Sequence, residues 1–317
     1  MLEQVTAGGL LAAGSPVVVM FSGGRDSTCL LDLAVRIAGA EMVTAMHVNY
    51  GLRGAADADE RHCAEICEQL GVQLDVRRPV RPEGGGNVQA WARDERYRAA
   101  ADLAVARNAS VAAGHTRSDQ VETILYRLAS SPSRRALLGM RARDGALIRP
   151  LLPFAREETA AYCSERGLRW RDDESNESSA YARNRIRREL VPALERIHPA
   201  AQDNVLAVAE ILRDEAEVLD EVVATALDGR DEIELTRLRD LAPAVRRLVV
   251  QRLADQACGG PAAGAARRAE EVAALSAHGT AALDLPHGVR ATVTQGVLSL
   301  GLTPRSGPQP GVREHAP

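Results

Sequence analysis

Six residues at Ser22–Ser27, SGGRDS, follow a short apolar run and precede a stretch with helical spacing. A turn between a strand and a helix directs backbone N–H groups and the positive end of the helix dipole at one place, which favours an anion. Gly23 and Gly24 accept backbone angles that other residues resist, and they leave room for a phosphate. Ser22 and Ser27 add hydroxyl donors. The segment predicts a phosphate-binding turn; a glycine turn that only caps the helix is the alternative.

Asp26, inside the same segment, supplies a carboxylate suited to Mg²⁺ carried by a nucleotide. The chain contains no lysine, because all 39 basic residues are arginine. A phosphate loop of the GxxxxGKS/T type requires a lysine, and so does a covalent lysyl-nucleotide or Schiff-base intermediate. The composition therefore excludes these mechanisms.

Apolar runs alternate with helical segments through the first half of the chain. The expected strands are 16–21, 42–49, 72–76 and 110–114, and the expected helices are 27–38, 58–70, 87–108 and 118–129. This alternation implies an α/β fold, in which helices cover both faces of a doubly wound, mostly parallel sheet. Ligands of such sheets bind at the carboxyl ends of the strands, where Ser22, His47 and His115 are all expected.

The remainder of the chain has a different pattern. Segments 82–86 and 130–133 are expected to be surface loops, and a helical linker is expected over 199–228. Residues 229–302 predict a small α+β domain of two helical segments followed by three short strands. The expected organisation is thus a catalytic domain over 1–198, the linker, the small domain, and a disordered tail over 303–317.

Charge is unevenly distributed along the chain. The formal net charge is −4, yet residues 127–196 contain 15 arginines against 10 acidic residues. Arg183, Arg185, Arg187 and Arg188 crowd one expected helix start, which favours contact with a phosphate backbone. Neutralisation by the nearby acidic residues, which are Asp172, Asp173, Glu174 and Glu177, is the alternative, and would give a solvated mixed-charge surface.

The five cysteines form no CxxC pair, so they indicate neither a disulfide framework nor a zinc or iron–sulfur site. Cys63 and Cys67, one helical turn apart, are expected to be buried side chains on one helix face. No apolar run has the roughly twenty residues that a membrane helix needs, and the N-terminus lacks the basic start of an export signal. We expect a soluble, cytoplasmic protein with no membrane partner.

The SGGRDS segment closely resembles the SGGxDS pyrophosphate loop of the N-type ATP pyrophosphatase superfamily. Further segments resemble one of its families, tRNA(Ile)-lysidine synthetase. They are HVNYGLRG at 47–54, WARDERY at 91–97, GHTRSDQVET at 114–123 and NRIRRELVP at 184–192, the last preceded by Trp170, Asp172, Asp173 and Asn176. Several motifs in the right order are more specific than any one. The chain departs from the family pattern at Asn49, Tyr50, Thr116 and Ser118.

The resemblance implies an adenine nucleotide alpha-hydrolase-like fold and a reaction in two steps. O2 of the wobble cytidine in the CAU anticodon of a tRNA(Ile) attacks the α-phosphate of ATP and releases pyrophosphate. Free L-lysine then displaces AMP at C2, which changes decoding from AUG to AUA. ATP and Mg²⁺ are the implied cofactors, the small C-terminal domain is expected to contact the tRNA, and a homodimer is possible.

Negative charge builds at the α-phosphate in the first step, so a cation is needed there, and Arg93 is the candidate. Asp119 is expected to receive the lysine ammonium, with a nearby carboxylate accepting its proton, and His115 to orient the nucleotide or stabilise charge. From the residues alone, a surface role for Arg93 and a structural one for His115 stay open.

The expected site residues fall into three sets. The expected catalytic residues are Asp26, Arg93, His115 and Asp119, of which Asp26 is also the expected metal ligand. The expected nucleotide-binding residues are Ser22, Gly23, Gly24, Arg25, Asp26, Ser27, His47 and Gly114. The expected tRNA- or lysine-binding residues are Arg53, Arg96, Glu122, Asn184, Arg185 and Arg188. A tRNA thiolase is the alternative within the superfamily, although such enzymes have paired cysteines, and an ATP sensor without catalysis is the alternative from another class.

Overall fold

The computed structural model describes residues 1–52, 54–82, 86–131, 134–171 and 182–304. The chain forms two compact units, Met1–Leu212 and Arg213–Pro317. The boundary falls within α10 (Ala201–Leu227), which covers most of the residues of the expected linker. Within the described residues, no helix combines the length and apolar character that crossing a membrane requires.

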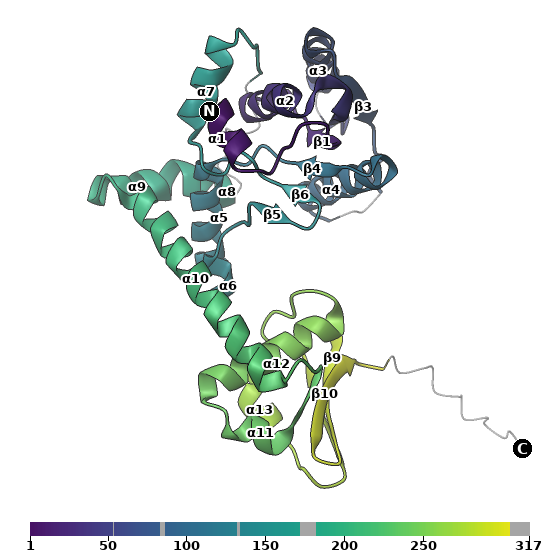
Figure 1. Ribbon diagram of the computed structural model, residues 1–317, viewed down its shortest axis with the longest axis vertical. Helices are drawn as coiled ribbons and strands as arrows, with labels where there is room; N and C mark the ends of the chain where they lie inside the picture. The colour runs from purple at the N-terminus through teal and green to yellow at the C-terminus, as the bar shows by residue number, and fades with distance from the viewer. Residues whose placement is uncertain (53, 83–85, 132–133, 172–181, 305–317) are drawn as a thin grey trace, which may run out of the picture. The chain divides into compact units, whose positions relative to one another are not determined.

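The first unit is built on a six-stranded sheet (Figure 1). Its strands are β1 (Val17–Met20), β2 (Val43–Val48), β3 (Gln73–Arg77), β4 (Ser110–Ala112), β5 (Arg143–Asp144) and β6 (Leu147–Ile148). Their order is β3-β2-β1-β4-β6-β5, and every pairing is parallel except that of β5 with β6. The predicted doubly wound, mostly parallel sheet is confirmed; the two-residue strands β5 and β6 were not predicted.

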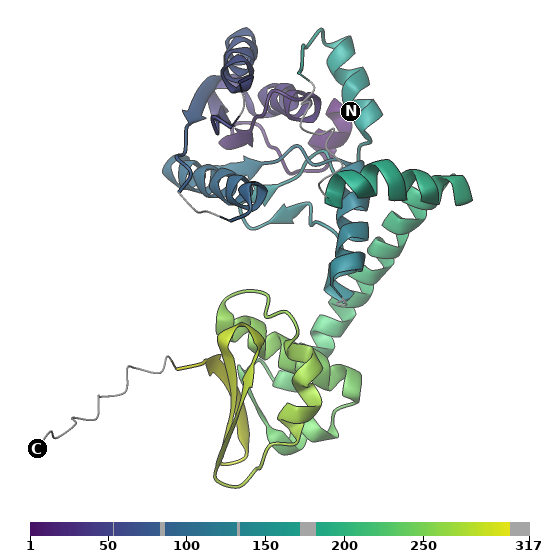
Figure 2. The ribbon, with the colours of Figure 1, turned by 180° about the vertical axis from the view of Figure 1, so that it is seen from behind.

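The sheet is covered by helices on both faces, as the two views from front and back show (Figure 2). The helices of this unit are α1 (Leu2–Ala7), α2 (Arg25–Ala38), α3 (Ala56–Leu70), α4 (Val88–Arg107), α5 (Arg117–Ser130), α6 (Arg134–Leu137), α7 (Arg156–Glu165), α8 (Ala182–Arg185) and α9 (Val191–Ile197), with a 3₁₀ turn, η1 (Ala40–Met42), and a π-helical turn, η3 (Ile186–Leu190).

Alternate residues of β1 enter different cores, because successive side chains of a strand point to opposite faces. Val17 and Val19 pack with α2, α3 and α7, whereas Val18 and Met20 pack with α4. All four side chains are buried, which is expected of a central strand covered on both sides. This arrangement places the turn after β1 in the middle of the carboxyl edge.

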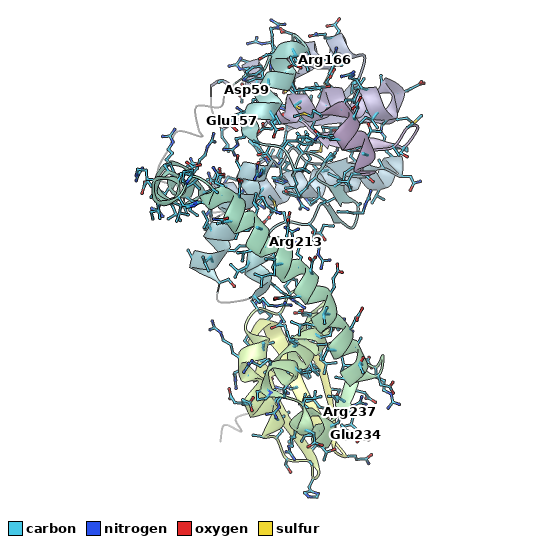
Figure 3. The ribbon with its side chains drawn as sticks, turned by 60° about the vertical axis from the view of Figure 1, so that its left-hand side comes forward. Asp59, Glu157, Arg166, Arg213, Glu234 and Arg237 are labelled. Carbon is cyan, nitrogen blue, oxygen red and sulfur yellow. The ribbon has the colours of Figure 1, made fainter. Side chains whose placement is uncertain are left out.

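Local signals define the helix ends. Asn87 caps α4, since its side-chain oxygen accepts hydrogen bonds from the backbone N–H groups of Gln89 and Ala90. α3 ends at Gly71, which adopts the left-handed conformation that glycine accepts most readily. At the end of α7, Arg166 (Figure 3) pairs with the buried carboxylate of Asp32 at 3.2 Å and so ties α7 to α2.

The second unit has its own antiparallel sheet and its own core. Its strands are β7 (Glu232–Glu234), β8 (Thr280–Leu285), β9 (Val289–Thr294) and β10 (Val297–Leu302), in the order β7-β10-β9-β8. Its other elements are α11 (Leu235–Asp240), α12 (Pro243–Cys258) and α13 (Ala269–Ala273), with the 3₁₀ turns η4 (Ala265–Arg268) and η5 (Pro286–Gly288). Figure 3 marks Glu234 at the end of β7 and Arg237 in α11. The small α+β character predicted for this region is confirmed, although β7 was not predicted.

Candidate active site

The turn after β1 is closed by its own hydroxyl groups. Oγ of Ser27 donates to the carbonyl oxygen of Gly24 at 2.8 Å, and it lies 3.1 Å from Oγ of Ser22. The amide of Ser22 donates to Oγ of Ser27 at 3.3 Å, and Oγ1 of Thr28 donates to the carbonyl oxygen of Gly24 at 3.0 Å. Gly24 is the N-cap of α2, so the loop lies at the positive end of that helix dipole. The predicted strand, turn and helix are confirmed.

Two of the three glycines around this loop, Gly23 and Gly114, leave no space for a side chain, whereas a Cβ atom on Gly24 would make ordinary contacts. Gly23 has φ of +78°, and a Cβ atom there would lie 3.0 Å from Sγ of Cys63. A Cβ atom on Gly24 would lie 3.4 Å from Oγ of Ser22. Gly114, which follows β4, approaches the first turn of α2 so closely that its Cβ atom would lie 3.2 Å from the carbonyl group of Asp26. Gly114 therefore packs against the backbone of the glycine loop.

Asp26 is hydrogen-bonded through one of its two carboxylate oxygens. Oδ1 accepts hydrogen bonds from Nε of Arg25 at 3.0 Å and from Oγ1 of Thr159 at 2.5 Å. Oδ2 accepts none from the described residues, and it lies 3.9 Å from Nε of Arg156. One carboxylate oxygen is thus left for a ligand beside the glycine loop.

Arg156, at the start of α7, connects the carboxylates of two other helices. Its guanidinium lies 3.9 Å from Asp26 of α2, 2.6 Å from Asp119 and 3.1 Å from Glu122, both of α5. The side chain is 13% exposed, and its pKa stays above the usual range because these carboxylates outweigh the cost of burial. Neither Arg156 nor Thr159 was predicted from the sequence.

Asp119 is held on both of its carboxylate oxygens. Oδ2 accepts hydrogen bonds from the backbone N–H of Thr116 at 2.9 Å and from Oγ1 of Thr116 at 3.0 Å, and these bonds cap α5. Oδ1 accepts a hydrogen bond from Arg156. Burial alone would raise the pKa of Asp119, but Arg156 and the hydrogen bonds from Thr116 hold it below the usual range. The departure at Thr116 thus supplies a helix cap.

Glu122 accepts fewer hydrogen bonds than Asp119, the other carboxylate at the start of α5. Arg156 at 3.1 Å and Arg187 at 4.0 Å both approach Oε1, whereas Oε2 accepts no hydrogen bond from the described residues. The residue is 5% exposed, and this burial raises its pKa above the usual range for a glutamate. A buried carboxylate with one oxygen unused can accept a proton or a cation.

His115 lies beside Gly114, and its Nδ1 is buried without a partner among the described residues. Burial lowers its pKa to about 4; Asp119 opposes that shift, and the nearby cations Arg149, Arg183 and Arg93 add to it. The imidazole is therefore neutral near pH 7.

The segment after β2 is held to α3 and α4 by the two residues that depart from the family pattern. The buried side-chain amide of Asn49 donates to Asp57 at 3.1 Å and to Glu60 at 2.9 Å, and the hydroxyl of Tyr50 donates to the carbonyl oxygen of Ala92 at 2.7 Å. Tyr50 therefore ties this segment to α4. His47 lies in β2, where its Nδ1 is 3.0 Å from the carbonyl oxygen of Phe21 and 3.3 Å from Sγ of Cys63.

On α4, the guanidinium of Arg93 lies over the ring of Tyr97, 4.7 Å from its centroid, and that of Arg96 lies 5.8 Å from it. On α8, Arg183 donates to Oγ1 of Thr123 at 2.8 Å. Arg185 and Arg188 are exposed, and Asn184 is half-buried. Arg53 lies outside the described residues, as do Asp172, Asp173 and Asn176.

Sequence signals for the missed residues are weak. Arg156 lies 27 residues beyond the last expected helix of the α/β pattern, which ends at residue 129, and it belongs to none of the quoted motifs. Its importance rests on burial between α2 and α5, and burial of an arginine is not visible in composition or spacing. The same holds for Arg149, which is 7% exposed and follows the unpredicted strand β6.

Comparisons with known proteins identify the family of this chain. Residues 3–194 match the PP-loop domain family ATP_bind_3. The tRNA(Ile)-lysidine synthase of Pseudomonas fluorescens is 40% identical over 64% of this chain and 47% of its own length. That of Symbiobacterium thermophilum is 38% identical over 98% of this chain and 69% of its own length.

Among solved structures, a U34-tRNA thiolase from Methanococcus maripaludis, described with its 4Fe–4S cluster, has a TM-score of 0.57 over 67% of this chain and 77% of its own. At 17% identity, that likeness concerns the fold alone. The chain spans about half the length of the Pseudomonas relative and about two thirds of the Symbiobacterium relative. Because a PP-loop domain matches and one relative is similar over 98% of this chain, the chain belongs to the tRNA(Ile)-lysidine synthase family.

Proposed function

We propose that the protein ligates free L-lysine to C2 of the wobble cytidine of a tRNA(Ile) with a CAU anticodon, using ATP and releasing AMP and pyrophosphate. One observation carries the proposal. The glycine loop at the N-terminus of α2 and the carboxylates of α5 lie at one edge of the sheet, joined by Arg156. A phosphate-binding end and an amine-binding end thus share one site, as ligation of an amine at the expense of ATP requires.

At the nucleotide end, the backbone N–H groups of the glycine loop receive the β- and γ-phosphates of ATP. The membership of residues 3–194 in the PP-loop domain family supports this role. The unused Oδ2 of Asp26 fits Mg²⁺, which usually meets only one or two protein carboxylates and takes its other ligands from phosphates and water. When bound, the ion would neutralise charge on the leaving pyrophosphate.

In the first step, O2 of the cytidine attacks the α-phosphate, and the adenylated base and pyrophosphate form. Arg93 stabilises the charge that builds on the α-phosphate, and the tyrosine ring beneath its guanidinium restricts its position. His115, which is neutral near pH 7, can orient the nucleotide through a hydrogen bond from or to its buried Nδ1.

In the second step, the lysine amine attacks C2 and AMP leaves. Both oxygens of Asp119 are already hydrogen-bonded, whereas Oε2 of Glu122 is not. We therefore assign Glu122 the contact with the incoming ammonium and the acceptance of its proton, with Asp119 supporting the positive charge nearby. The raised pKa of Glu122 suits a group that must take up a proton near neutral pH.

The remaining assignments concern the RNA and the division of the chain. Arg185 and Arg188 of the NRIRREL segment are exposed and supply cations for phosphate contacts. We retain the division into a catalytic domain over 1–198, a linker over 199–228 and a tRNA-contacting domain over 229–302. Exchange of Arg185 and Arg188 for alanine should weaken tRNA binding and reduce its salt dependence.

The experiment incubates the full chain with a tRNA(Ile) transcript carrying the CAU anticodon, ATP, Mg²⁺ and isotopically labelled lysine. Mass spectrometry of the digested RNA should find the label on the wobble cytidine, and pyrophosphate should appear only with tRNA present. Incorporation of sulfur from an added donor would favour a thiolase instead. Binding of ATP with no pyrophosphate under any of these mixtures would favour an ATP sensor.

A variant separates the amine end from the rest of the reaction. Glu122→Gln should raise KM for lysine and change the affinity for ATP much less, because Glu122 faces the amine in this proposal and reaches the nucleotide end only through Arg156. Glu65→Gln is the matched control, since Glu65 belongs to an exposed ion pair with Arg169. A normal KM for lysine in Glu122→Gln would refute the assignment of this residue.

A further inference from the structure

Four arginines share one property; three of them act on His115, and the fourth, Arg127, lies near those three. None of them forms an ion pair with a carboxylate of the described residues. They are Arg93, Arg127, Arg149 and Arg183, called here the arginine cluster. Within the described parts of the chain, their guanidinium groups contact neutral partners: the ring of Tyr97, the carbonyl oxygens of Gly139 and Arg141, and the hydroxyl of Thr123, respectively. Such a concentration of unpaired positive charge is costly without an anion.

Arg149 is the innermost member of the cluster. It is 7% exposed, its NH1 group donates to the carbonyl oxygen of Arg141 at 2.6 Å, and its Nε is buried without a partner in the described residues. Arginine is rarely buried to this extent unless it is paired. A buried guanidinium with an unused donor therefore points to a ligand that the described residues do not supply.

The sheet places Arg149 beside the segment that carries His115. Ile148 of β6 lies opposite Ala112 of β4, and the amide of Ala113 donates to the carbonyl oxygen of Ile148 at 2.9 Å. Arg149 and the Gly114–His115 segment thus leave neighbouring strands at the same carboxyl edge. The glycine loop follows β1, on the other side of β4 in the sheet.

The members of the cluster lie close enough to repel one another. Burial lowers the pKa of Arg127, and Arg183, Arg93 and Arg149 lower it further. The same three cations lower the pKa of His115 in addition to burial, so the imidazole adds a polar group without a charge. Asp119, the carboxylate that opposes them at His115, is already bonded to Arg156 and Thr116.

We propose that the arginine cluster is a second anion subsite, distinct from the glycine loop, that binds one phosphate group through the buried Nε of Arg149 with Arg127 and Arg183 flanking it. The inference rests on the proposed function, because that reaction brings phosphate from two sources. One source is the α-phosphate of ATP, and the other is a phosphodiester of the RNA beside the reacting cytidine. Binding measurements on the full chain separate the two.

The test compares Arg149→Gln with wild type, and Arg141→Gln is the charge-matched control because the Arg141 side chain is exposed. ATP binding is measured by calorimetry without RNA, and binding of the tRNA(Ile) transcript is measured without ATP over a series of NaCl concentrations. If ATP supplies the phosphate, Arg149→Gln weakens ATP binding about tenfold or more and leaves tRNA binding unchanged. If the RNA supplies it, tRNA binding weakens and the slope of log K against log salt falls by about one.

A measurement without either substrate tests the unpaired charge itself. Millimolar inorganic phosphate should raise the Tm of wild type and of Arg141→Gln more than that of Arg149→Gln, since removal of the buried cation removes the anion contact. In phosphate-free chloride buffer, Arg149→Gln should be at least as stable as wild type, because it lacks a buried unpaired charge.

The proposal is overturned if Arg149→Gln binds both ATP and tRNA as wild type does. It is also overturned if the variant is less stable than wild type in chloride buffer and gains as much Tm from phosphate, since Arg149 would then only brace the carbonyl of Arg141. A wild-type chain that binds ATP and tRNA but forms no lysidine would refute the proposed function, while these comparisons would still decide the subsite.

Discussion

Gly114 shows how little space separates the segment after β4 from the first turn of α2. Because a methyl group there would lie 3.2 Å from the backbone of Asp26 and Ser27, Gly114→Ala must push the glycine loop away. We expect a cost of about 1–3 kcal/mol, divided between the free energy of unfolding and that of ATP binding. Urea unfolding and calorimetric titration with ATP measure the two parts.

Gly260→Ala is the control for this change, since a Cβ atom at Gly260 meets nothing within 4 Å and its φ is not positive. It should leave stability and ATP affinity within error of wild type. Wild-type behaviour of Gly114→Ala in both measurements would show that the contact with the loop is not constraining.

His115 should make the protein less stable in mild acid. Its folded pKa of about 4 lies below the ordinary 6.5, so the unfolded chain takes up this proton first as the pH falls. The contribution of neutral His115 to the free energy of unfolding is fully present above about pH 6.5 and is lost as the pH falls from 6.5 to 4. About 2 kcal/mol is lost between pH 7 and pH 5. Urea unfolding at both pH values should show a smaller decrease for His115→Gln; an identical decrease would contradict the shift.

At the residue scale, the sequence predicted the groups that belong to short motifs and missed those that act through burial. The segments SGGRDS and GHTRSDQVET predict the glycine loop, His115 and Asp119 as site residues, because glycines and polar groups at fixed spacing are uncommon outside such turns. Arg156 and Arg149 stand among many arginines in an arginine-rich region. Only the packing of α7 and β6 distinguishes them.

At the element scale, α7 acts as a clamp on α2 and α5. Arg156→Gln removes the cation that three carboxylates share, so we expect a loss of about 3–5 kcal/mol in the free energy of unfolding. Arg169→Gln, which breaks an exposed pair with Glu65, should cost less than about 1 kcal/mol. Urea unfolding of the two variants checks the difference, and equal losses would argue against the clamp.

Long elements were predictable because their apolar spacing extends over several turns or pairs. The helices expected at 87–108 and 199–228 and the strands β1 to β4 were predicted within a few residues of their observed bounds. β5, β6 and β7 are two or three residues long, and so short a segment carries no periodicity. The π-helical turn Ile186–Leu190 was likewise expected only as part of a helix, since its hydrogen bonding has no distinct sequence pattern.

At the scale of the whole molecule, the two units have separate cores. Leu253 is 2% exposed in the core of the second unit, so Leu253→Ala should destabilise that unit by about 2–5 kcal/mol. ATP affinity, which depends on the first unit, should not change. Limited proteolysis and ATP titration measure the two effects. Val218→Ala, at a position that is 61% exposed, is the control, and reduced ATP affinity in Leu253→Ala would show that the units are coupled.

The sequence indicated two regions of different pattern, since strands alternate with helices in one and follow helices in the other. The observed boundary lies inside α10, where no composition change marks it. A long helix with a continuous apolar stripe gives no signal at the point where its contacts change from one core to another.

The shared guanidinium of Arg156 has a thermodynamic consequence. A cation or phosphate that arrives near Asp26 alters how strongly Arg156 attracts the carboxylates of α5, and an ammonium that arrives at α5 alters how strongly it attracts Asp26. Thermodynamic linkage requires the effects on binding affinity to be reciprocal. If ATP changes the affinity for lysine by some factor, lysine changes the affinity for ATP by the same factor. In the proposed reaction, α7 would therefore couple the binding of ATP to the binding of lysine before either substrate has reacted.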